Sequence, residues 1–148
     1  MLMKKNTAKL AFLNLSSVLL LLVLFFTGCV NFGGSKNDDI EILQEEKSPN
    51  GKFVATSFSC SGGGAAGYFF FNANLRKVDD QLDTRDVLMG KHKTWKAFFD
   101  IDVRWIDDAN LEVSYYQKSG SAYEKNNAVK VESKYGLKIH HRIKPGKF

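Results

Sequence analysis

The sequence predicts a mainly β protein with a single small antiparallel β-sheet domain, in the form of a meander, a sandwich or a small barrel. From residue 40 onward, apolar and polar residues alternate with a period of two, which is typical of strands with one buried face. Turn-forming groups such as Asn50-Gly51 separate the alternating stretches. In this part of the chain, no stretch of useful length repeats apolar residues with the 3.6-residue period of a helix.

The composition is that of a globular chain with room for one domain. Of the 148 residues, 44% are apolar and 13% are aromatic, which is enough to fill a small core. The two cysteines are too few for a disulfide network or a four-thiolate zinc site. We therefore expect neither a disulfide scaffold nor a disordered chain. The sequence indicates no cofactor, no metal ion and no convergent catalytic set.

The first 28 residues are expected to be a secretory signal peptide. Three lysines precede an unbroken run of nine apolar residues, 18–26. A helix that spans a membrane needs about 20 apolar residues, so this run fits the apolar region of a signal peptide better. The alternative is an uncleaved N-terminal anchor whose apolar stretch begins near Leu10.

The end of this run, Phe26-Thr27-Gly28-Cys29, resembles the lipobox of bacterial lipoproteins. In that class, a diacylglyceryl group is attached to the cysteine thiol and the chain is cut just before the cysteine. The resemblance implies cleavage after Gly28, lipidation of Cys29 and a lipid-anchored place on the extracytoplasmic face of the cell membrane. Two acyl chains anchor a protein firmly, whereas one does so only marginally. The sequence departs from the class at Phe26, where Leu is usual.

Removal of the leader also changes the charge. The chain has 21 basic and 16 acidic residues, but three lysines lie in residues 1–28, so the remainder has 18 basic residues and a net charge of +2. This small excess gives no reason to expect nucleic-acid binding. Residues 29–39 are rich in Gly, Ser, Asn and Asp. We expect them to be a flexible tether with a reach of about 15–20 Å.

The domain, residues 40–148, is expected to contain six or seven short strands joined mostly by short turns. The alternating stretches are residues 40–44, 52–60, 68–75, 101–105, 111–115, 129–132 and 137–143. On the third stretch, Phe69, Phe71 and Ala73 share one face. On the last stretch, Leu137, Ile139, His141 and Ile143 form an inward row. Residues 78–96 lack a two-residue period and are expected to form a loop with one helical turn.

Three segments resemble a family of small bacterial lipoproteins and secreted proteins of unknown function, the DUF5412 type. They are the turn Ser48-Pro49-Asn50-Gly51-Lys52, the segment CSGGGAAGY over residues 60–68, and VRWIDDANLEVSY over residues 103–115. The resemblance covers about residues 45–116 and implies a fold type and a surface location, but no activity. The chain departs from the family at residues 64–67, where hydroxyl residues are expected.

One candidate site is the loop that follows the second strand. Cys60, Ser61, Gly62, Gly63 and Gly64 place a thiol beside backbone N–H groups, a geometry suited to an anion or another ligand. If the thiol were a nucleophile, His140 or His141 would be its base. The alternative is that the glycines form a wide turn and that Cys60 is buried at the end of a strand.

A second candidate is a basic patch on the outward face of the last strand. Its members are Lys138, His140, Arg142 and Lys144, with Lys130 and Lys134 nearby in the sequence. Such a patch suits anionic lipid headgroups or anionic envelope polymers. The alternative is a charged strand face that resists aggregation.

Other chemistry-bearing residues have simpler interpretations. Asp107, Asp108 and Asn110 have turn chemistry and lack the spacing of a calcium-binding loop. Because neighbouring residues of a strand face opposite sides, His140 and His141 cannot hold one metal ion together. Trp105 and Tyr115 are expected in the core, and Tyr116 and Trp95 are the aromatic residues expected to be exposed in a ligand groove.

The sequence therefore predicts an extracytoplasmic lipoprotein, anchored to the membrane through Cys29. We expect its domain to be a non-enzymatic binding or accessory module of the cell envelope, with another envelope protein or an anionic polymer as partner. The alternative is a small envelope hydrolase or thiol enzyme that uses Cys60.

Overall fold

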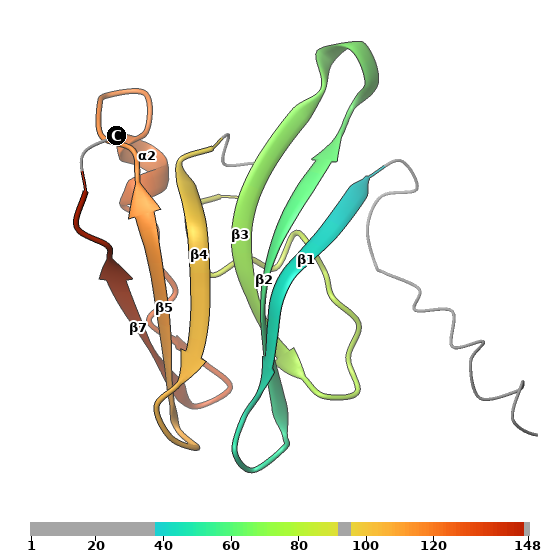
Figure 1. Cartoon of the computed structure of the whole chain (residues 1–148), viewed down its shortest axis with the longest axis vertical. Coiled ribbons are helices and arrows are strands. Elements are labelled where there is room, and N and C mark those ends of the chain that lie inside the picture. Colours follow the sequence, from blue (N-terminus) through green and yellow to red (C-terminus); the bar gives the residue numbers. More distant parts are fainter. Residues whose placement is uncertain (1–37, 92–95, 147–148) are drawn as a thin grey trace, which may run out of the picture. The chain divides into compact units, whose positions relative to one another are not determined.

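The computed structural model describes residues 38–91 and 96–146 of the chain. These residues form seven strands, β1 (Asp39–Lys47), β2 (Phe53–Gly62), β3 (Tyr68–Lys77), β4 (Phe98–Trp105), β5 (Asn110–Gln117), β6 (Ser133–Lys134) and β7 (Leu137–Ile143) (Figure 1). The short 3-10 turn η1 (Gly64–Ala66) and the single-turn helix α2 (Glu124–Asn127) complete this part of the chain. The prediction of a mainly β domain is confirmed. The described residues include no helix with the length and apolar character needed to cross a membrane.

The first sheet is an antiparallel meander in the order β1-β2-β3. Its first hairpin turns at Asn50-Gly51, as the sequence predicts. The Ser48 N–H donates to the Phe53 carbonyl at 2.9 Å, and the Gly51 N–H donates to the Ser48 carbonyl at 2.8 Å. The Asn50 side-chain oxygen accepts from the Lys52 N–H at 3.0 Å. Gly51 has a φ of 70°, a conformation in which a side chain is strained.

The second sheet has the order β4-β5-β7-β6 and departs from a purely antiparallel meander. β4 and β5 form the predicted hairpin, in which the Asp107 carboxylate accepts from the Ala109 N–H at 2.8 Å. β7, however, pairs parallel to β5. The nineteen residues 118–136 between them, which include α2 and β6, allow the chain to return to the same end of the sheet.

Both sheets contribute to one apolar core, while no strand joins one sheet to the other, so the described domain is a two-sheet arrangement and not a closed barrel. Ala55, Ala73 and Leu75 come from the first sheet. The second sheet supplies the residues Ile101, Val103, Leu111, Val113, Tyr115, Leu137 and Ile139. Alternating residues that the sequence assigns to the core, among them Val103, Val113 and Tyr115, therefore fill it.

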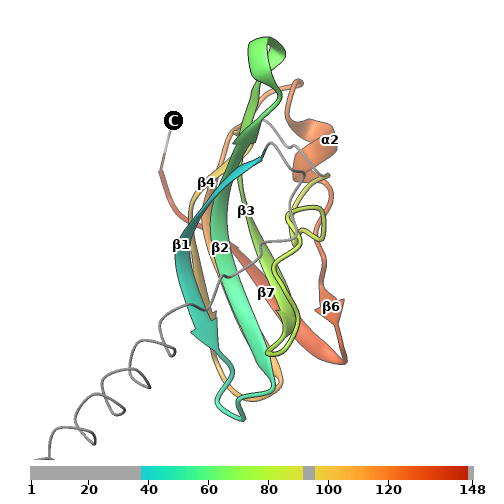
Figure 2. The same cartoon turned by 90° about the vertical axis from the view of Figure 1, so that its right-hand side faces the viewer.

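The outer face of the first sheet is also covered. Phe58, Cys60 and Phe70 form a second buried cluster with Leu82, which belongs to the segment that follows β3. This segment, residues 78–91, runs on toward residues 129–131, where it forms an isolated bridge between Met89 and Lys130 (Figure 2). Because of this cover, the middle of β2 is buried on both faces.

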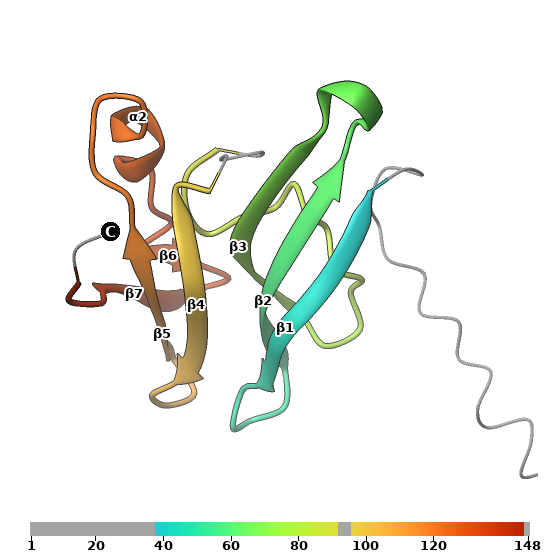
Figure 3. The same cartoon turned by 45° about the horizontal axis from the view of Figure 1, so that its top comes forward.

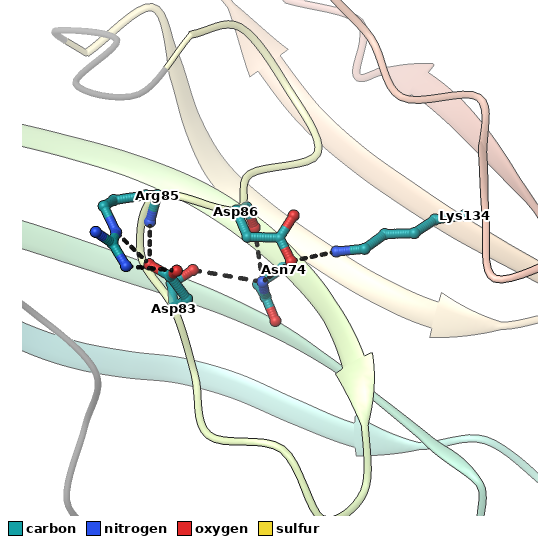
Figure 4. Close-up of polar contacts among 5 residues, drawn as sticks. All are labelled: Asn74, Asp83, Arg85, Asp86 and Lys134. Carbon is teal, nitrogen blue, oxygen red and sulfur yellow. Dashed lines mark hydrogen bonds and ion pairs between the residues drawn. The ribbon is translucent and has the colours of Figure 1, made fainter.

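Polar side chains hold the covering segment in place (Figure 4). The Asn74 amide donates to the Asp86 carbonyl at 2.6 Å and reaches the Asp83 carbonyl at 3.5 Å. The Asp83 carboxylate is paired with Arg85 at 2.9 Å. Lys134 of β6 forms an ion pair with the Asp86 carboxylate. The segment is thereby tied to β3 on one side and to β6 on the other.

The edges of the two sheets are joined by side chains of β1 and β4. The Gln44 amide donates to the Val103 carbonyl at 3.0 Å, and its oxygen accepts from the Val103 N–H at 3.0 Å. Nearby, the Trp105 indole N–H donates to the Glu46 carbonyl at 3.2 Å. These contacts fix β1 against β4 without a strand ladder between them.

Two sequence predictions about individual elements are wrong. Residues 129–132 form only the isolated bridge at Lys130, because hydrogen bonds to residues 88 and 90 replace a longer ladder. Ile143 is 56% exposed, because it lies at the end of β7 beyond the core. The described part of 78–96 contains turns but no helical turn, and residues 92–95 lie outside the described part of the chain, so the expected helical turn stays a prediction.

Candidate functional site

A groove of about 460 Å³ opens where β3 and β4 begin and β5 ends. Its walls are Phe69, Phe71, Lys96, Phe99 and Lys118. β3 and β4 belong to different sheets and share no hydrogen-bonded ladder (Figure 3). We call these five residues the aromatic groove.

Three phenylalanine rings form the apolar wall of the aromatic groove, and one of them is stacked on a neighbouring tyrosine. Phe69 and Phe71 lie on the same face of β3 and meet edge to face, with centroids 4.8 Å apart. Phe99 of β4 stacks on Tyr116, its cross-strand partner on β5, at 5.6 Å. All four rings are half-buried. Paired aromatic rings with exposed faces and edges offer contact area to an apolar ligand at little cost in side-chain entropy.

The two charged residues of the aromatic groove, Lys96 and Lys118, are both basic. The Lys96 ammonium lies 5.4 Å from the centroid of the Phe69 ring, and the Lys118 ammonium lies 5.7 Å from that of Tyr123. Among the described residues, the lining includes no acidic side chain. An apolar wall in a groove that two lysines also line suits a ligand with an aromatic or aliphatic body and an anionic group.

A second depression, of about 620 Å³, lies beside β7. Its lining combines the side chains of Lys130, Glu132, Ser133, Lys138, Ile139, His140 and His141. Burial raises the pKa of Tyr115, which lies behind this region, to about 12 and lowers that of Lys130 to about 8. Burial also lowers the pKa of His141, although the Val131 carbonyl, 3.0 Å from its ring nitrogen, opposes this effect.

Several predicted residues lie outside the described part of the chain. They include the cleavage position Gly28, the lipidation position Cys29, and Trp95, which the sequence places at a ligand groove. Lipidation of Cys29 and the N-terminal signal peptide stay predictions from the sequence.

The loop at Cys60 has the form of a compact turn. Cys60 itself is fully buried in the cluster on the outer face of the first sheet. Beyond it, Ser61 and Gly62 end β2, and Gly63 and Gly64 adopt φ values of 91° and 58° on entering η1. His141 contacts Tyr115 in the second sheet. The Cys60 thiol therefore lies on the first sheet, whereas His141, one of the two histidines named as its base, lies on β7 of the second sheet.

The residues of the predicted basic patch lie along β7 and just after it, but neighbours neutralise half of them. The Arg142 guanidinium is 3.3 Å from the Glu112 carboxylate, and the Lys144 ammonium is 2.7 Å from the Asp102 carboxylate. His140 shares a hydrogen bond of 2.9 Å with Asn110. Among the residues described, Lys138, which is exposed and lines the second depression, forms no ion pair.

The turn after β4 follows its predicted chemistry. The Asn110 amide donates to both Asp107 oxygens, at 2.8 and 2.9 Å, and these hydrogen bonds lower the pKa of Asp107. No group of three or more His, Cys, Asp or Glu side chains within 38–91 and 96–146 is arranged to hold a metal ion. Tyr115 is buried as predicted, and Trp105 is partly buried against the core.

The sequence reasoning missed the aromatic groove, although Tyr116, which it named as exposed, is stacked on one of its rings. A signal was present in two runs, YFFF at residues 68–71 and Phe98-Phe99. Consecutive aromatic residues in a strand point to both faces, so they cannot all enter one core. This pattern therefore predicts a second apolar surface outside the core. It does not predict that this surface lies between two sheets, because that position depends on the tertiary fold.

No protein-family model, no curated protein and no solved structure matches this chain. The resemblances to bacterial lipoproteins and to the DUF5412 type remain predictions from the sequence.

Proposed function

We propose that this chain is a lipid-anchored extracytoplasmic lipoprotein whose β domain binds a small anionic amphiphile in the aromatic groove, without catalysis. The lipobox-like segment that ends at Cys29 supports the anchor. The observation that carries the binding function is the pairing of three phenylalanine rings with two ammonium groups in one opening. The ligand has an apolar body for the rings and a sulfonate-, carboxylate- or phosphate-like group for Lys96 and Lys118.

A pair of fluorescent probes tests the binding function on the compact unit 32–148. The probes are 8-anilinonaphthalene-1-sulfonate and N-phenyl-1-naphthylamine, which have the same ring system with and without the anionic group. Phe99→Ala should weaken both probes by about tenfold, because it removes a ring from the wall. A double Lys96→Gln and Lys118→Gln variant should weaken the sulfonate alone.

The matched control is Lys138→Gln, which removes an exposed ammonium outside the aromatic groove. This variant should leave both affinities unchanged. Equal loss of the two probes in the double lysine variant, or an unchanged affinity in Phe99→Ala, would contradict the proposed site.

The lipid anchor has a separate test. Mass spectrometry of the protein purified from bacterial membranes should find an acylated Cys29 at the new N-terminus. Cys29→Ala should remain uncleaved and lack the acyl mass. An unmodified Cys29 in membrane-purified material would overturn the anchor and leave the binding test unaffected.

A further inference from the structure

Lys130 occupies a fixed place between the covering segment and β6. The Gly90 N–H donates to the Val129 carbonyl at 2.8 Å, and the Val131 N–H donates to the Leu88 carbonyl at 3.0 Å. These bonds hold the backbone on both sides of Lys130. The direction of its side chain is therefore set by the fold and not by a mobile loop.

The Lys130 ammonium lies in an aromatic and neutral environment. Its nitrogen is 4.2 Å from the centroid of Phe98 and 4.8 Å from that of Tyr115. Its hydrogen-bond acceptor is the Gln117 side-chain oxygen at 3.1 Å. His141 also lies close enough to interact electrostatically with it. Burial favours the uncharged amine here, and within the described part of the chain no carboxylate is paired with it.

Other largely buried cations of the domain have carboxylate partners. Arg76, Lys134 and Lys144 have side chains that are between 12% and 16% exposed, and each forms an ion pair with a carboxylate. Among the described residues, Lys130 forms no ion pair. Lys130 therefore differs from the buried cations that have a structural ion pair. A desolvated lysine without a carboxylate partner is the kind of lysine that acts as a nucleophile.

Lys130 also lines the second depression, with Ser133, Ile139 and His141 beside it and Glu132, Lys138 and His140 completing the lining. A volume of about 620 Å³ is sufficient for a small organic molecule. The Lys130 side chain thus contributes to the wall of a space that a reactant can enter, and its amine is activated by its aromatic and neutral surroundings.

We propose that Lys130 is a covalent capture site for small aldehydes or ketones that enter this depression. The lone pair of the amine nitrogen forms a bond with the carbonyl carbon, and the carbonyl oxygen takes up a proton. Loss of this oxygen as water, with both amine hydrogens, leaves a carbon–nitrogen double bond. Hydrolysis reverses the step, so no oxidant or reductant is required.

Reductive trapping tests this site in the full chain in detergent. Acetaldehyde is the probe, sodium cyanoborohydride reduces the imine, and mass spectrometry counts ethyl groups at each lysine. At pH 7.5, Lys130 should react about tenfold faster than the exposed Lys52, since a larger fraction of it is uncharged although each amine is a weaker nucleophile. Its rate should level off above about pH 8, whereas that of Lys52 should rise to pH 10.

Two variants make the result specific. Gln117→Glu places a carboxylate at the acceptor position, so Lys130 should slow to the rate of Lys52 without loss of the amine. Lys130→Arg keeps the cation over the rings and should remove this modification while the circular dichroism spectrum is unchanged. Labelling of Lys130 no faster than Lys52, or an unchanged rate in Gln117→Glu, would overturn the proposal.

Discussion

Asn72 and Met89 exchange two hydrogen bonds across the outer face of the first sheet. The Asn72 amide donates to the Met89 carbonyl at 2.6 Å, and the Met89 N–H donates to the Asn72 side-chain oxygen at 3.2 Å. Both residues are fully buried. One side chain on β3 thus supplements the backbone contacts of the covering segment 78–91, in which the Leu88 N–H donates to the Ala73 carbonyl and Met89 forms the isolated bridge with Lys130.

Asn72→Ala should therefore destabilise the domain by about 2–4 kcal/mol, because a buried N–H and a buried carbonyl lose their partner. Urea unfolding followed by tryptophan fluorescence measures this loss. Ser121→Ala, an exposed substitution in the loop after β5, is the control and should change the free energy of unfolding by less than about 0.5 kcal/mol. A similar, small change in both variants would show that Asn72 does not anchor the segment.

Lys130 should make stability depend on pH in the alkaline range. Its pKa is about 8 in the folded protein and about 10.5 in the unfolded chain, which therefore binds more protons between these values. The free energy of unfolding should rise with pH from 8 toward 10.5. Measurements should end near pH 9.5, because the raised pKa of Tyr115 has the opposite effect once tyrosines ionise in the unfolded chain.

Lys130→Met tests this origin, since it keeps an apolar stem over the rings and removes the titrating group. The variant should be more stable than the parent at pH 7.5, and its stability should lack the rise up to pH 9.5. Thermal unfolding at half-unit pH steps measures the difference. If the stability of parent and variant changed with pH in the same way, groups other than Lys130 would be responsible for the pH dependence.

Cys60 should react with thiol reagents only when the outer cluster opens. In a Cys29→Ser background, Cys60 is the remaining cysteine, and its side chain is fully buried. Labelling by an aromatic disulfide reagent should be at least about a thousandfold slower in buffer than in concentrated urea, since the opening of buried elements limits the rate. Rapid labelling in buffer would place the thiol at the surface and favour the alternative hypothesis, a thiol enzyme that uses Cys60.

The hairpin at Gly51 should tolerate asparagine better than alanine. Its φ of 70° is unfavourable for residues with a Cβ, but a Cβ added there meets no heavy atom within 4 Å. Gly51→Ala should cost about 1 kcal/mol through backbone strain alone, and Gly51→Asn should cost less. A loss above about 3 kcal/mol for alanine would indicate a steric contact instead.

The predictable part of the fold is the part with local signals. The hairpins at Asn50-Gly51 and at Asp107 follow from side-chain and backbone chemistry within a few residues of each turn. The parallel pairing of β5 with β7 could not be derived in this way. It depends on how the nineteen intervening residues pack, and both orientations leave the same alternating residues facing inward.

The candidate sites were less predictable, because they combine residues from distant parts of the chain. Phe69 and Phe99 carry aromatic signals, but only the gap between two sheets turns them into a groove. Lys130 looked like a member of a surface patch, since nothing nearby in the sequence indicates that Phe98 and Tyr115 enclose its ammonium. The covering segment 78–91 was hard to predict for the same reason, because Asn72 and Asn74 supply its partners.

The link between Gln44 and Val103 has a consequence for self-association. β4 is an edge strand, and the outward backbone groups of an edge strand recruit strands from other molecules. The Gln44 amide occupies both groups of Val103, and β1, itself an edge strand, is irregular in register between Ile42 and Gln44. The edges at β1 and β4 are thus interrupted where a strand from a neighbouring copy would pair with them. Such interruptions discourage the growth of fibrils.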